Sequence, residues 1–277
     1  MDAASREEIG TMAENNRPHI DVTVPNVARM YDYYLGGKDN FAADRAAAAK
    51  VLQVAPFAPR LARQNRSFLA RAVRYLAGIG ITQFLDIGAG LPTQGNVHEV
   101  ARQVSPDARV VYLDNDPVVV THGRALLGVD RNTVVLQRDL RHSAELLGDP
   151  EIRELIRPGE PVGLLLLAVL HCLDAGDEPY RVMADLRKGL PAGSHVVISH
   201  ISGDDEVTAN SSTVYRDAST AMTHRTPDEI LGFFDGFGLL EPGLVALDRW
   251  RPDDTTAPAP ATGSGYFLCG VGRKESC

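Results

Sequence analysis

Cysteines and long apolar runs are both scarce in this chain. Three of its 277 residues are cysteines (Cys172, Cys269 and Cys277), and their spacing matches neither a metal site nor a disulfide framework. We therefore expect no bound metal and a reducing compartment, the cytoplasm. Residues 1–17 are polar and lack the apolar core of a signal peptide, so we expect them to be disordered. No run is long enough to cross a membrane.

Positive charge is also in deficit. The chain has 28 lysines and arginines against 36 aspartates and glutamates, a net charge of −8. Proteins that bind a nucleic-acid backbone usually carry a basic surface, so this balance argues against a nucleic-acid partner. The candidates for a local basic patch are Arg60, Arg63, Arg66, Arg71 and Arg74. They spread around the axis of one predicted helix, so a solvent-exposed helix surface explains them better than a binding patch.

A third glycine is missing from the most informative turn of the sequence. Residues 84–90 read FLDIGAG, an apolar strand followed by a turn with two glycines. A dinucleotide-binding turn needs G-x-G-x-x-G, and Thr93 stands where the last glycine belongs. Asp86, just before the turn, would repel a pyrophosphate and suits a ligand with an ammonium group. Both observations argue against a nicotinamide-dependent oxidoreductase, one alternative class of enzyme.

S-adenosylmethionine carries an ammonium, a sulfonium, a ribose diol and an adenine, and it has no phosphate. We therefore predict that this cofactor contacts Asp86, Gly88, Ala89 and Gly90, since glycines let the backbone turn sharply and a ligand approach closely. The competing interpretation is that Asp86 only caps the turn and that the glycines only reverse the chain.

Two further apolar strands end in acidic residues. Residues 110–114 end in Asp114, which is predicted to accept hydrogen bonds from the ribose diol beside Asn115. Residues 134–137 precede Asp139 and Leu140, whose carboxylate and amide are predicted to bind the adenine. Ligands of open α/β sheets bind at the carboxyl ends of the strands, which is where all three acids fall.

The remaining chain predicts the rest of one sheet. Residues 162–168 and 194–200 are apolar strands, with a helix from Pro179 to Leu190 between them. Thr226-Pro227-Asp228-Glu229 is a capping box at a helix start. Residues 244–250 and 266–271 predict a final antiparallel hairpin. This pattern is typical of an α/β fold, the Rossmann-like, seven-stranded sheet of class I methyltransferases with a reversed last strand.

An N-terminal helical extension precedes the first strand. The pattern predicts a helix that starts at Val27 and breaks at Gly36-Gly37, and a second that has Asp39 or Asn40 as N-cap and covers residues 41–53. A third helix covers residues 60–77. We divide the chain into a disordered N-terminus (1–17), a helical lid (18–79) and a cofactor-binding domain (80–277).

The turn between the first two helices has two interpretations. It is either an ordinary glycine-capped turn or part of the cofactor site. In the second case the site includes Gly37, Lys38 and Asn40, with Lys38 near the cofactor carboxylate, and three tyrosines wall the pocket: Tyr31, Tyr33 and Tyr34.

Six strings of the sequence carry a resemblance. They are residues 31–41 (YDYYLGGKDNF), 65–69 (NRSFL), 84–98, 111–118, 168–171 (AVLH) and 233–236 (FFDG). With them the chain, from about residue 25 to 253, resembles a largely actinobacterial family of S-adenosylmethionine-dependent methyltransferases formerly described as a domain of unknown function. The resemblance implies the methyltransferase fold and cofactor binding, and within the strings we expect Arg66 and Ala168 to join the cofactor site. Cys172 departs from the family, which more usually has an aromatic residue there.

Catalysis of methyl transfer needs positioning and, for a poor nucleophile, removal of a proton. His171 follows the fourth strand and is the predicted general base, although a histidine here can also serve only to hydrogen-bond the strand end. His200 is the second candidate. Asp174 and Asp177 are expected to orient His171 or contact substrate, and residues 202–226 to form a substrate lid.

The acceptor is predicted to be a small molecule. The sequence lacks the Asn-Pro-Pro-aromatic motif of amino-group methylation, which favours oxygen or carbon acceptors. The alternative is a regulatory protein that binds S-adenosylmethionine or S-adenosylhomocysteine without turnover. A homodimer is expected on base rates alone.

Overall fold

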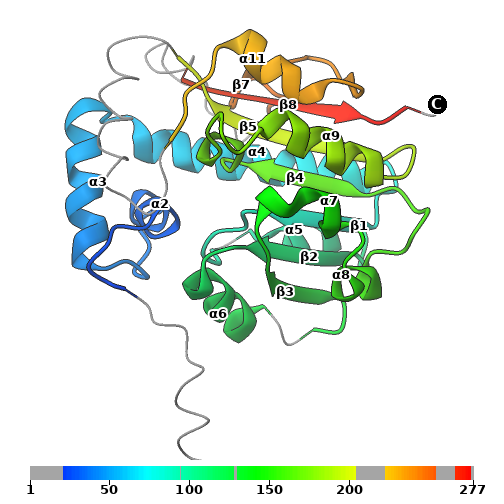
Figure 1. Ribbon diagram of the computed structural model, residues 1–277, viewed down its shortest axis with the longest axis horizontal. Helices are drawn as coiled ribbons and strands as arrows, with labels where there is room; N and C mark the ends of the chain where they lie inside the picture. Colours follow the sequence, from blue (N-terminus) through cyan, green and yellow to red (C-terminus); the bar gives the residue numbers. More distant parts are fainter. Residues whose placement is uncertain (1–20, 94, 128–129, 204–221, 254–265, 276–277) are drawn as a thin grey trace, which may run out of the picture.

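The computed structural model describes residues 21–93, 95–127, 130–203, 222–253 and 266–275. An eight-stranded sheet runs through the molecule in the order β3-β2-β1-β4-β5-β8-β6, and β7 also pairs with β8 (Figure 1). The strands are β1 Gln83–Ile87, β2 Arg109–Asp114, β3 Thr133–Gln137, β4 Gly163–Leu167, β5 His195–Ile201, β6 Gly238–Leu239, β7 Val245–Ala246 and β8 Phe267–Arg273. Strands β1 to β5 pair in parallel, and β8 runs antiparallel to β5.

Helices surround the sheet. They are α2 Val27–Leu35, α3 Ala42–Val54, α4 Ala58–Gly78, α5 Val97–Arg102, α6 Pro117–Leu126, α7 Ser143–Leu146, α8 Pro150–Leu155, α9 Pro179–Gly189 and α11 Pro227–Leu231. Three short 3-10 helices are η1 Leu140–His142, η2 Leu170–Cys172 and η3 Gly232–Phe234. Figure 1 shows α2 and α3, in blue, beyond one end of the sheet. No helix in the described part of the chain is long and apolar enough to span a membrane.

Alternate strand residues enter two apolar cores, one on each face of the sheet. Phe84 and Val110 join the core that α4 and α5 cover, whereas Leu85 and Val111 join the core under α7, α8 and α9. Strands buried on both faces read as continuous apolar runs, which is why the sequence pattern locates them. The two cores fix the sheet, and hence the strand ends at which ligands of such folds bind.

The predicted fold class is confirmed, with one difference at the sheet edge. The sequence predicted one strand over residues 244–250. In the structure only β7 lies in this range, and it and the preceding short strand β6 pair with different parts of β8. The prediction was wrong beyond Ala246 because the chain there turns into the core, where Trp250 is fully buried. Arg71, on α4, donates to the carbonyls of Leu247 and Trp250, which a strand would have offered to the sheet.

The sequence predicted the starts of two helices correctly and the start of a third wrongly. Helix α9 lies where the sequence placed it, and Thr226 and Glu229 form the capping box of α11. Helix α3, by contrast, begins after Phe41, whose N–H donates to the Asp44 carboxylate at 2.7 Å. Asp39 and Asn40 are therefore not its N-cap: Asp44 also binds Arg29 (2.9 Å from Nε), so the helix start is fixed by a tertiary ion pair.

The long helix α4 contacts both the sheet and the N-terminal helices α2 and α3. Phe68, Ala72 and Leu76 on α4 lie in the same core as β1 and β4. At its other end, Leu61 and Ala62 face α2 and α3 across a cavity. The division of the chain at residues 79 and 80 stays a prediction, as do the disorder of residues 1–17 and the substrate lid, since residues 1–20 and 204–221 lie outside the described residues.

Candidate functional site

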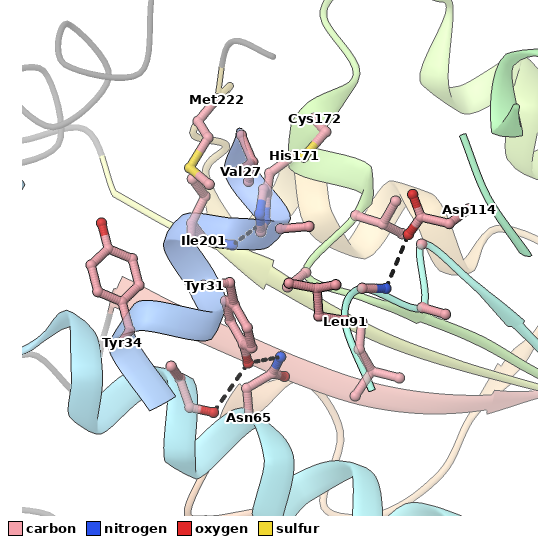
Figure 2. Close-up of a pocket in the computed structure, with 18 of the residues that line it drawn as sticks. Val27, Tyr31, Tyr34, Asn65, Leu91, Asp114, His171, Cys172, Ile201 and Met222 are labelled. Carbon is pink, nitrogen blue, oxygen red and sulfur yellow. Dashed lines mark hydrogen bonds between the residues drawn. The ribbon is translucent and has the colours of Figure 1, made fainter. Parts of the chain in front are cut away.

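A cavity of about 550 Å³ lies at the carboxyl edge of the sheet (Figure 2). Its walls come from the ends of β1 to β5, from α2, α3 and α4, and from short segments at residues 222–224 and 266–267. Tyr31, Tyr34, Asp174 and Asp177, all predicted for the pocket or the substrate, line it. So do eleven residues predicted as cofactor-binding or catalytic: Arg66, Asp86, Gly88, Ala89, Gly90, Asp114, Asn115, Asp139, Leu140, Ala168 and His171.

Asp86 lies at the base of the cavity on β1. Its side chain is 5% exposed, and no described residue hydrogen-bonds its carboxylate. Burial raises the pKa of Asp86 to about 7, opposed by the nearby Arg66 and reinforced by Asp114. A buried carboxylate without a partner costs free energy, and a cationic or hydrogen-bond-donating group that enters the cavity would offset that cost.

The glycine turn after Asp86 leaves room for a ligand. Gly88 and Gly90 have φ angles of +72° and +66°, which favour glycine. A Cβ on Gly88 would lie 2.4 Å from the Val169 side chain, so this glycine allows β1 and the β4 loop to pack. A Cβ on Gly90 would meet nothing within 4 Å, and Gly90 lines the cavity. The first glycine therefore serves packing and the second keeps the cavity open.

Asp114 ends β2 and lies beside this turn. Its carboxylate accepts from the N–H of Gly90 at 3.0 Å and from the N–H of Asp116 at 2.9 Å. Burial raises the pKa of Asp114 to about 6, although both backbone donors oppose the shift. The two hydrogen bonds fix the carboxylate at the cavity wall, where lone pairs remain for a further donor.

Asp139 and Leu140 lie at the start of η1 on the same wall. Asp139 accepts from the backbone N–H of Arg141 at 2.9 Å and binds its guanidinium through both oxygens. The Arg141 side chain lowers the pKa of Asp139, so this acid stays ionised at neutral pH. Arg141 thus binds the same carboxylate that is predicted from the sequence to bind the adenine. The adenine contact of Asp139 stays a prediction.

His171 lies on η2, shortly after Ala168, which follows β4 and has a φ of +57°. The imidazole is 2% exposed and lines the cavity. Its Nδ1 accepts from the N–H of Ile201 at 3.4 Å, shown dashed in Figure 2. Burial, with the neighbouring His200, His224 and Arg225, lowers the pKa of His171 well below its ordinary value. The ring is therefore neutral, and its proton lies on Nε2.

A family model described as S-adenosyl methyltransferase matches residues 13–275 of the chain. The chain belongs to this family. A crystal structure of a candidate methyltransferase from Thermobifida fusca is 41% identical over 94% of this chain and 98% of that chain, with a TM-score of 0.87. A DUF574 family protein from Streptomyces avermitilis is 36% identical over 92% of this chain and 100% of its own, with a TM-score of 0.88.

The S-adenosyl methyltransferase is thus an enzyme that uses S-adenosylmethionine, which confirms the expected activity and cofactor. A more distant structure, an O-methyltransferase family protein from Burkholderia thailandensis, has a TM-score of 0.52 at 12% identity and covers 88% of this chain and 64% of that chain. That likeness shows the fold alone. No curated protein matches the sequence.

His200 does not reach the cavity of the methyltransferase. It is fully buried, its Nδ1–H donates to the carbonyl of Ile201 at 2.6 Å, and its Nε2 accepts from Arg225 at 2.9 Å. Burial lowers its pKa to about 3. Because both ring nitrogens are used and the ring is uncharged, His200 cannot serve as the second general base predicted from the sequence. Instead it anchors Arg225.

Gly37, Lys38 and Asn40 also lie away from the cavity. Asn40 donates to the Asp32 carboxylate at 2.8 Å, and a Cβ on Gly37 would lie 1.9 Å from that carboxylate. Lys38 is exposed. These residues build the turn between α2 and α3 around Asp32, and the cofactor contacts predicted for them are not supported. Of the three tyrosines, Tyr31 and Tyr34 line the cavity.

A buried hydrogen-bond chain under the cavity was missed from the sequence. Ser199 accepts from the N–H of Ala168 at 3.0 Å and donates to Asn65 at 2.7 Å. The Asn65 amide then donates to the Tyr31 hydroxyl at 3.0 Å, which donates to the carbonyl of Ala62 at 3.1 Å. The chain ties β4 and β5 to α4 and α2. Its one signal in the sequence is an amide, Asn65, on the apolar face of α4.

Proposed function

We propose that this methyltransferase transfers a methyl group to a small molecule bound in the cavity at the sheet edge. The observation that carries the proposal is the size of the site: α2, α3 and α4 flank the strand ends around a cavity of about 550 Å³, the size of a small-molecule pocket. The net charge of −8 gives no support to a nucleic-acid acceptor. Every group that the proposal uses lies on one chain, so it does not depend on the homodimer, which stays a prediction.

The residues present fit S-adenosylmethionine. Asp86 is a buried carboxylate without a partner among the described residues, and Gly90 faces open space beside it. In the proposal Asp86 binds the ammonium of the cofactor and Arg66 its carboxylate. Asp114 binds the ribose diol, with Asn115 beside it. When bound, the cofactor supplies a methyl group on a positively charged sulfur, which is already a reactive donor.

His171 fits a donor better than the general base expected from the sequence. Its Nδ1 is occupied by the N–H of Ile201, and a buried ring among other basic groups resists a second proton. We assign Nε2–H to the acceptor atom, which it orients by donating a hydrogen bond. The backbone at His171 is held in turn, because the N–H of Thr223 donates to the His171 carbonyl at 2.7 Å.

The decisive test is the affinity for S-adenosylhomocysteine, measured by calorimetry on the wild type and on Asp114→Ala. We expect the variant to bind more weakly by roughly 1–3 kcal/mol, because the ribose hydroxyls lose their acceptor. Asp107→Ala, at an exposed position away from the cavity, is the control and should keep the wild-type affinity. Equal affinity of wild type and Asp114→Ala would remove Asp114 from the site.

A further inference from the structure

The cavity has two chemically different halves. Charged side chains line the half near the ends of β1, β2 and β3, where Asp86, Asp114 and Asp139 gather with Arg66 and Arg141. The other half lies between α2, the first turns of α4 and the ends of β5 and β8. In Figure 2 Asp114 lies on one side of the cavity, and Tyr34 and Met222 lie on the other. The proposed cofactor contacts occupy only the first half.

Aromatic and aliphatic side chains form the second half, here called the apolar chamber. Its main walls are Tyr31, Tyr34, Phe57, Met222, Tyr266 and Phe267. The rings of Phe57 and Tyr266 stack with centroids 5.0 Å apart and planes 19° from parallel. Phe267 meets the His171 ring edge-on, with centroids 6.0 Å apart, so His171 lies at the boundary of the chamber.

None of these main walls is a lysine or arginine; Arg66 lies near both Asp86 and Tyr31, and His224 also lines the cavity. Asp32, a carboxylate on α2 that also lines the cavity, is turned to its own loop, where it accepts from Asn40 at 2.8 Å and from the N–H of Asp39 at 3.0 Å. The amide of Asn65 and the hydroxyl of Tyr31 are bound to each other. A charged ligand group would therefore lose its water and find no oppositely charged side chain among the main walls of the chamber.

We propose that the apolar chamber binds the methyl acceptor, and that this acceptor is an uncharged molecule with a flat aromatic ring and a hydroxyl oxygen directed at His171. The inference rests on the proposed function and specifies its substrate class. Stacked and edge-on rings and a thioether are the surfaces that a flat ring packs against best. In the reaction the acceptor oxygen forms a bond to the methyl carbon while the carbon–sulfur bond breaks. The electron pair of that bond stays on sulfur, and the hydroxyl proton leaves to water.

Three probes that share one ring system test this class. Calorimetry on protein saturated with S-adenosylhomocysteine compares 2-naphthol, 2-naphthoate and 2-naphthylmethylammonium, which are neutral, anionic and cationic at pH 7. We expect 2-naphthol to bind at least tenfold tighter than either charged probe. Equal binding of all three, tighter binding of a charged probe, or no binding of 2-naphthol overturns the inference. Failure of the wild type to bind S-adenosylhomocysteine overturns the proposed function instead.

Two adjacent tyrosines supply a matched pair of variants. Tyr34 lines the chamber and Tyr33 does not, although both lie on α2. Tyr34→Ala should weaken 2-naphthol binding at least fivefold, Tyr33→Ala should change it less than twofold, and both should keep the affinity for S-adenosylhomocysteine, which shows that they fold. Met222→Lys places a cation in the chamber and should make 2-naphthoate the preferred probe. An unchanged preference in Met222→Lys would place the probe elsewhere and overturn the assignment.

Discussion

Replacing Asp86 by asparagine should make the ligand-free protein more stable and the cofactor site weaker. The carboxylate is 5% exposed and has no hydrogen bond from the described residues. An ionised group in that environment is unfavourable, whereas the amide of asparagine has the same shape and no charge. Stability and cofactor binding therefore pull this position in opposite directions.

The size of the effect follows from the pKa of Asp86, which burial raises from 3.8 to about 7. Because the folded state holds the proton more tightly than the unfolded state, ionisation of Asp86 destabilises the fold as pH rises, and the full penalty is present above about pH 7. A pKa change of this size corresponds to about 4 kcal/mol of stability. The unpaired amide of asparagine removes part of the stability that loss of the charge restores. We expect Asp86→Asn to be about 2–4 kcal/mol more stable than the wild type at pH 8.

Urea unfolding of both ligand-free proteins at pH 8 and pH 5 checks this value. The advantage of Asp86→Asn should shrink by about 2–3 kcal/mol at pH 5, where the wild-type carboxyl is protonated in the folded state. Asp114 also titrates in this range and its charge contributes to the raised pKa of Asp86, so the difference between the two proteins reports Asp86 together with its coupling to Asp114. Asp107→Asn, at an exposed position away from the cavity, is the control for the substitution itself. A variant less stable than wild type at pH 8, or an advantage independent of pH, would refute the reasoning.

Two other substitutions probe the loops around the site. Gly88→Ala places a Cβ 2.4 Å from Val169 at a φ of +72° and should destabilise the fold by about 2–4 kcal/mol in urea unfolding. Gly90→Ala should cost about 1 kcal/mol in the same measurement and should instead lower the affinity for S-adenosylhomocysteine. Similar stabilities of the two variants would contradict the different roles of the two glycines. Arg225→Ala removes donors from two loop carbonyls and His200 and should cost about 3 kcal/mol by the same measurement; a loss below 1 kcal/mol would show that this buried arginine does not hold the loop of His171.

The sequence predicted the sheet and one half of the cavity because those signals are local. Each parallel strand contains an apolar run, and Asp86, Asp114 and Asp139 lie at or shortly after the ends of three of these runs. Parallel topology brings strand ends to one edge, so three acids far apart in the chain meet without further information. Their positions on the cavity were predictable for that reason, while their contacts with the cofactor stay proposals.

What the sequence could not supply are partners that only the tertiary fold brings together. In the sequence Asn40 resembles a ligand-binding amide, but in the structure it donates its hydrogen bond to Asp32. His200 resembles a catalytic base, but Arg225 occupies its second ring nitrogen. Trp250 ends a run that reads as a strand, yet burial of its ring draws the backbone away from the sheet edge. In each case a contact distant in sequence outweighed a local pattern.

The hydrogen-bond chain through Asn65 has a consequence for how this protein can diversify. One helix, α4, covers the sheet with its second half and walls the apolar chamber with its first, and Asn65 joins the two halves to Ser199 on β5. The N-terminal helices are consequently not an interchangeable module that could be grafted onto another sheet of this class. Changes of acceptor range would then come from substitutions at the chamber walls, such as Tyr34 and Met222, within a frame that Asn65 and its partners hold constant.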